Sequence, residues 1–102
     1  MLYNLHCQHI ELSDLERDEL DKKINRLTRH VTLPYTLDVT LQHDTHHLKG
    51  DVITCRMNIN QGKKVFHAER VGSTIADTVD EVLDALKSEL EKAHDRHKDR
   101  HE

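Results

Sequence analysis

Residues 35–42 read YTLDVTLQ and alternate apolar and polar side chains without a break. This two-residue period is typical of a strand that has one face on a core and the other in water. The same alternation returns in ITCRMNI at 53–59, and the turn residues NQG at 60–62 separate it from the apolar VFHA at 65–68. The sequence therefore predicts a strand and then a β-hairpin, with a polar, His-rich loop at 43–50 between them.

A helix is predicted before this group of strands. Ser13 and Glu16 form a capping-box pair, and carboxylates crowd the turns that follow, where they favour the helix dipole. Pro34 prevents the helix from continuing, and we place its end near His30. Its apolar positions recur at helical spacing: Leu20, Ile24, Leu27 and Val31.

The two ends of the chain complete the pattern. Residues 1–9 alternate like a half-buried strand, and Ser73 is suited to cap a long second helix that runs to about His97. The apolar stripe of that helix is Ile75, Val79, Val82, Leu83, Leu86, Leu90 and Ala93. The order β-α-β-β-β-α predicts an α+β fold, in which both helices cover one face of a four-stranded sheet. We expect one domain over residues 1–102, with a frayed charged tail from about residue 98.

Composition excludes several classes of protein. The net charge of −4 argues against indiscriminate coating of nucleic acid, and three glycines leave no room for a nucleotide-binding loop. No nucleophile elbow or carboxylate pair suggests an enzyme. The N-terminus lacks the features of a signal peptide, and no run of 18 apolar residues occurs, so we expect neither secretion nor a membrane span. Cys7 and Cys55 lie in alternating stretches, where we expect reduced, buried thiols.

The first helix carries a basic stripe opposite its apolar positions. Lys22, Arg26 and Arg29 form the stripe, with Lys23 and His30 beside it. Two interpretations stay open, a solvated face whose cations favour the helix C-terminus and a surface that binds phosphate. Since the chain has only three aromatic residues, RNA binding would rest on its backbone and shape rather than on base stacking.

Several fragments in order resemble one family, the ribosome hibernation promoting factors and ribosome-associated inhibitors, also called the sigma-54 modulation protein family. Residues 10–15 (IELSDL) are similar to its N-terminal signature, and residues 23–27 (KINRL) to its basic-apolar-x-basic-Leu segment. The remaining matches are Phe66-His67-Ala68, Gly72, Val79-Asp80 and the closing residues 92–100. Because the chain stops after the second helix, without the extra dimerisation domain of the long forms, it resembles the short form.

This resemblance implies a fold similar to a double-stranded-RNA-binding domain with an added strand. It also implies a bacterial, cytoplasmic, monomeric factor without a cofactor, which occupies the messenger and transfer RNA channel of the small ribosomal subunit and inhibits translation in stress or stationary phase. Whether a separate partner pairs the ribosomes stays open. The family's ribosomal-RNA-binding positions fall on Lys23, Arg26, Lys92 and Arg96, which Lys22, Arg29 and Lys98 would extend.

Three positions depart from the family's usual pattern. The family usually has Tyr where this chain has Ala76, and basic residues where it has Ala85 and Ser88. One alternative is therefore that the fold has diverged into a protein-binding module, whose acidic second helix docks a basic partner.

The other alternative is metal binding through two groups of histidines. Imidazoles at such spacings can bind Zn or Co, although no cysteine or supporting carboxylate completes either set. The two groups are His43, His46 and His47 in the predicted loop, and His94, His97 and His101 near the C-terminus.

Overall fold

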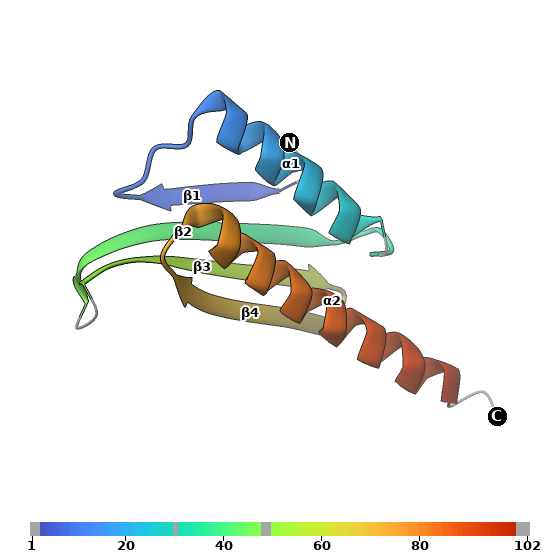
Figure 1. Cartoon of the computed structure of the whole chain (residues 1–102). Coiled ribbons are helices and arrows are strands. Elements are labelled where there is room, and N and C mark those ends of the chain that lie inside the picture. Colours follow the sequence, from blue (N-terminus) through green and yellow to red (C-terminus); the bar gives the residue numbers. More distant parts are fainter. Residues whose placement is uncertain (1–2, 30, 48–49, 100–102) are drawn as a thin grey trace.

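The structure is a computed structural model that describes residues 3–29, 31–47 and 50–99, and their side chains except those of 46–47 and 94–99. Figure 1 shows a sheet with two helices above it. The elements, in order, are β1 (Asn4–Gln8), α1 (Asp14–Thr28), β2 (Thr36–His47), β3 (Gly50–Gln61), β4 (Lys64–Gly72) and α2 (Ile75–Asp99). None of the described helices has an apolar stretch long enough to cross a bilayer.

The four strands lie in the sheet in the order of the chain. β1 runs parallel to β2, whereas β2, β3 and β4 form an antiparallel meander. Both helices cover the same face of the sheet (Figure 1), and the predicted β-α-β-β-β-α order and α+β fold are confirmed. The helices run in the same direction along the sheet, because residues from their N-terminal halves lie together, as do residues from their later turns.

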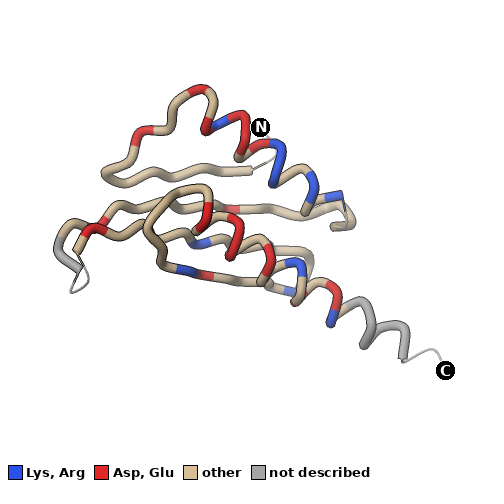
Figure 2. Tube along the Cα trace, viewed as in Figure 1, with Lys and Arg blue, Asp and Glu red and all other residues tan. Residues whose placement is uncertain are grey.

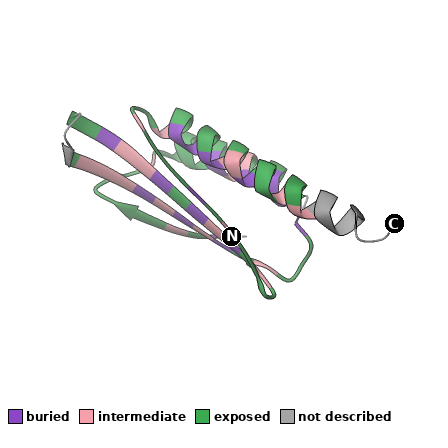
Figure 3. Ribbon diagram, turned by 90° about the horizontal axis from the view of Figure 1, so that it is seen from below, coloured by how far each residue is buried: buried purple, intermediate pink, exposed green. Residues whose placement is uncertain are grey.

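The core lies between the sheet and the two helices. The alternation at 35–42 is confirmed, since Leu37, Val39 and Leu41 are at most 1% exposed and face their cross-strand partners Ile59, Met57 and Cys55. The two helices contribute six more side chains to this core: Leu20, Ile24 and Leu27 from α1, and Val79, Val82 and Leu86 from α2. In Figure 3, buried residues (purple) lie next to exposed ones (green) along the helices and strands.

Side-chain caps begin both helices. The predicted capping box of α1 is confirmed, because the Glu16 amide donates to Ser13 Oγ at 3.1 Å and the Ser13 amide donates to Glu16 Oε1 at 3.1 Å. The predicted cap of α2 was one residue early. Thr74, not Ser73, occupies the N-cap, since Thr74 Oγ1 accepts from the amide of Asp77 at 3.2 Å.

Gly72 lets α2 approach the sheet closely. A Cβ on this glycine would clash with Oγ1 of Thr78, a fully buried residue of α2 whose hydroxyl donates to the Thr74 carbonyl. A position with no side chain is therefore required where β4 turns into the helix.

Two further predictions were wrong. Residues 43–47 do not form a loop but continue β2, paired to β3 through His43↔Ile53 and His47↔Gly50. Their polar composition is compatible with a hairpin that extends beyond the apolar core, where neither face needs to be apolar. Cys55 is buried as expected, but Cys7 is exposed, because it lies on the edge strand β1, which has no neighbour on its outer side.

Candidate nucleic-acid interface

A groove lies between the later turns of the two helices, and we call it the basic groove. It encloses about 640 Å³ and opens to solvent. From α1 and its C-cap it is lined by Lys23, Arg26, Leu27 and Arg29, and from α2 by Asp80, Leu83, Asp84 and Lys87. Leu27 is buried and Leu83 half-buried, so the floor is apolar while four cations and two carboxylates form the walls.

Three of the four cations are available to a ligand. Arg26, Arg29 and Lys87 are exposed, and within the described part of the chain no carboxylate lies at ion-pair distance from any of them. An anion that enters the groove would therefore meet charges that the protein itself has not neutralised.

Lys23 is held differently from the other three. Its Nζ lies 2.8 Å from Oδ1 of Asp80, so this ion pair crosses from α1 to α2. The Lys23 side chain is 22% exposed and that of Asp80 is 54% exposed. An incoming phosphate would have to compete with Asp80 for this lysine.

The structure separates the predicted RNA-binding residues into groups. Lys23, Arg26 and Arg29 line the basic groove, whereas Lys22 is directed to solvent near Glu19, at 4.0 Å. Lys92 lies five residues after Lys87, about 140° around the helix, and is close to Glu89 at 3.9 Å instead of lining the groove. The side chains of Arg96 and Lys98 lie outside the described residues, although α2 continues through both positions.

Lys87 is the groove residue that sequence reasoning missed. Its neighbours Asp84, Glu89 and Glu91 make that part of α2 read as an acidic, solubilising surface. Only the parallel packing of the two helices places Lys87 opposite Arg26 and Arg29. A search for cations one helical turn after the inward-facing Leu83 would have found it.

Charge is divided along the pair of helices. Figure 2 shows carboxylates concentrated on the first turns of α1 and α2, and cations on the second half of α1. The cations of α1 are also near the C-terminal end of its dipole, which stabilises positive charge there. One end of the helix pair is therefore suited to a phosphate backbone and the other end repels it.

Of the histidines considered as metal ligands, His43 has a described side chain. His43 lies on β2 with Nε2 3.9 Å from Oδ2 of Asp51, and among the described side chains no three His, Cys, Asp or Glu residues converge. His46, His47, His94 and His97 have side chains outside the described set, and His101 lies beyond the described residues altogether.

Comparison with known proteins identifies the family. Residues 3–98 match the sequence model of a family described as sigma 54 modulation protein / S30EA ribosomal protein. The chain belongs to this family. The resemblance seen in the sequence is thereby confirmed, and it places the chain among ribosome-associated factors. No curated protein matches the chain in sequence.

Two solved structures share the fold. One is the N-terminal domain of Protein Y from Thermus thermophilus, with a TM-score of 0.71, 19% identity, and coverage of 89% of this chain and 96% of that one. The other is a ribosomal subunit interface protein from Coxiella burnetii, with a TM-score of 0.75, 15% identity, and coverage of 92% and 98%. At these identities the likeness establishes the shared architecture of this member of the S30EA family.

Proposed function

We propose that this S30EA-family chain binds ribosomal RNA of the small ribosomal subunit through the basic groove and inhibits translation. The observation that carries the proposal is the set of cations, Lys23, Arg26, Arg29 and Lys87, which two separate helices bring to the walls of one groove. We further propose that it acts in the cytoplasm, without a cofactor or catalytic activity, when growth stops. This matches what its resemblance to hibernation factors implies.

The chemistry of the groove favours the RNA backbone over the bases. Phosphate contacts supply most of the affinity of proteins for folded nucleic acid and carry little sequence information. Base stacking would need exposed rings, but Tyr3 is buried, and Tyr35 and Phe66 are half-buried against the core. These are all the Phe, Tyr and Trp residues of the chain. Recognition would therefore depend on the shape and charge of a folded RNA.

The position of the charges also explains how an acidic protein could select RNA. The whole chain has a net charge of −4, and the carboxylates on the first turns of both helices would repel RNA approaching from that end. The free cations Arg26, Arg29 and Lys87 favour one orientation on the RNA. Binding would consequently be specific for a site of fitting shape rather than general.

The proposal is tested by sedimentation with purified small subunits in sucrose gradients over a salt series. The test variant, Arg26→Gln with Lys87→Gln, removes one exposed cation from each wall of the groove. We expect it to lose most of the co-sedimentation and to reduce the slope of log affinity against log salt by about two. Wild type, but not this variant, should also inhibit cell-free translation.

The matched control removes two charges elsewhere. Arg56→Gln with Arg17→Gln gives the same net charge, but Arg56 pairs with Glu69 on the outer face of the sheet, and Arg17 lies on the flank of α1 near Tyr3 and Cys7. We expect the control to co-sediment like wild type. If the two double variants lost binding equally, overall charge would explain the result and the groove would not be the docking surface.

A further inference from the structure

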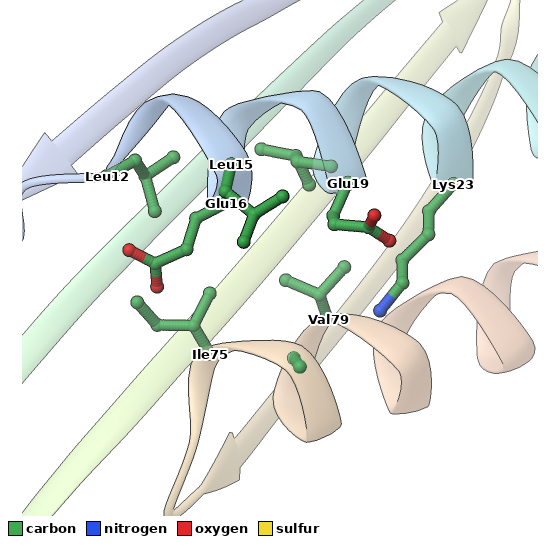
Figure 4. A pocket seen from close by; sticks show the side chains of 9 residues that line it. Leu12, Leu15, Glu16, Glu19, Lys23, Ile75 and Val79 are labelled. Carbon is green, nitrogen blue, oxygen red and sulfur yellow. The ribbon is translucent and has the colours of Figure 1, made fainter.

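A second hollow lies between the same helices, at their N-terminal ends, and we call it the apolar hollow. Leu12 and Leu15 from the α1 side and Ile75, Ala76 and Val79 from α2 form its walls (Figure 4). It encloses about 210 Å³. A water molecule occupies about 30 Å³ of liquid, so this volume corresponds to about seven waters. The hollow therefore has room for one large side chain.

The walls of the hollow are unusually apolar for an open surface. Leu15 is 71% exposed even though it is a large apolar residue on a charged helix. Leu12 and Ile75 are only partly buried at the edge of the core. An apolar group that entered would remove this surface from water, and such burial is favourable in proportion to its area.

The rim of the hollow is acidic. Glu16 and Glu19 project from α1 over the hollow, as Figure 4 shows. Lys23 lies at the end of the hollow nearest the basic groove, but its charge is already matched by Asp80 at 2.8 Å. Glu19 lies 4.0 Å from Lys22 in an exposed pair that a partner's cation can replace, and Glu16 also accepts the Ser13 amide through Oε1. The exposed rim therefore presents negative charge, and the Lys23–Asp80 pair separates it from the basic groove.

This end of the helices is not an anion site. One first-turn amide in each helix, that of Glu16 in α1 and that of Asp77 in α2, is already bonded to the cap side chain, Ser13 or Thr74. The carboxylates of the rim would repel a phosphate or an acidic peptide, whereas they would attract Lys and Arg side chains. Charge complementarity thus selects a basic occupant, and the apolar walls require that it bring an apolar group.

We propose that the apolar hollow docks a basic segment of a partner protein, which inserts one large apolar or aromatic side chain between Leu15 and Ala76 while its flanking cations meet Glu16 and Glu19. Peptide segments commonly dock in this way, with an apolar anchor in a groove and charges around it. The inference goes beyond the proposed RNA-binding function, because it uses the other end of the helix pair and a different ligand.

The test measures binding of a fluorescent synthetic peptide, one phenylalanine flanked on both sides by lysines and arginines, by fluorescence anisotropy. Replacing the phenylalanine by alanine should weaken binding about tenfold or more, because the anchor loses its buried area. In the protein, Ala76→Tyr fills the hollow from within and Leu15→Ser removes one apolar wall, and each should cause a similar loss. Glu19→Gln should weaken binding severalfold and reduce its salt dependence.

Ser88→Tyr is the matched control for Ala76→Tyr, since it adds the same ring at an exposed position of α2 outside the hollow, and it should bind the peptide like wild type. Equal binding of the phenylalanine and alanine peptides would overturn the proposal, because charge alone would then explain the attraction. Unchanged binding by both Ala76→Tyr and Leu15→Ser would overturn it as well. Sedimentation velocity tests whether a second copy of the chain occupies the hollow instead. A wild-type dimer that Ala76→Tyr dissociates would show this and would overturn the proposal.

Discussion

Neutralising Asp80 should increase affinity for the small subunit. Asp80 lies on the wall of the basic groove and holds Lys23 at 2.8 Å, so it competes with any phosphate for that lysine. In Asp80→Asn the groove would face RNA with four cations and one carboxylate in place of two. The substitution keeps the size of the side chain, and the change in binding therefore reports charge.

The size of the effect follows from the exposure of the pair. Asp80 and a phosphate bound at Lys23 would be two like charges close together. Two unit charges about 4 Å apart in water interact by about 1 kcal/mol, so removing this repulsion corresponds to roughly fivefold in the binding constant. One additional phosphate contact would also steepen the salt slope by about 0.9. Exposed ion pairs contribute about 0–1 kcal/mol to folding, and the Asp80 side chain is 54% exposed. We therefore expect about fivefold tighter binding with at most about 1 kcal/mol lost from the free energy of unfolding.

The assay is small-subunit binding by fluorescence anisotropy at several salt concentrations, with thermal melts to follow stability. Glu81→Gln is the matched control, since Glu81 is the next residue of α2, is exposed and does not line the groove. We expect the control to change affinity less than twofold. The reasoning would be refuted if Asp80→Asn bound no better than wild type, or if Glu81→Gln gained as much.

Four further outcomes are expected. Gly72→Ala should lower the free energy of unfolding by roughly 1–3 kcal/mol in denaturant titrations, because the new Cβ clashes with the buried Thr78. Ser13→Ala should cost about 0.5–2 kcal/mol in the same assay, through loss of the α1 cap. Alkylation at pH 8 followed by mass spectrometry should label the exposed Cys7 and leave Cys55 intact, because burial raises the pKa of the Cys55 thiol to about 12 and keeps it protonated. Thermal melts with and without a chelator should coincide, and a large loss of stability with chelator would revive the metal-binding alternative.

The fold could be predicted from the sequence because the apolar positions of the local patterns are the positions that the structure buries in its core. The alternation at 35–42 places Leu37, Val39 and Leu41 on the buried face, and the Ser13–Glu16 pair marks the start of α1 within one residue. The continuation of β2 through residues 43–47 was missed because strand pairing is a property of the backbone, whereas the polar side chains of this segment are typical of a loop. Adjacent Ser73 and Thr74 are equivalent as caps in sequence, and only the backbone decides between them.

The site could be predicted in part, for a similar reason. The stripe of Arg26 and Arg29 follows from the helical wheel of α1 alone. The positions of Lys87 and Asp80 opposite that stripe depend on how α2 packs beside α1, and no local pattern encodes this. The resemblance to the S30EA family led to Lys92, which the structure places on another face of α2.

The parallel pairing of β1 with β2 has a consequence for the order in which the chain assembles. The β2–β3–β4 meander joins neighbours in the sequence, whereas Asn4 meets Asp38 across 34 residues, so the loop closed by β1 carries the larger entropic cost. During synthesis β1 leaves the ribosome before α1 and β2, and it must therefore wait for both before it can pair. Once in place, this five-residue edge strand is held by one ladder and by the Tyr3 hydroxyl, which donates to Asp21 of α1. We therefore expect local opening of the sheet to begin at β1, while the three antiparallel strands stay paired.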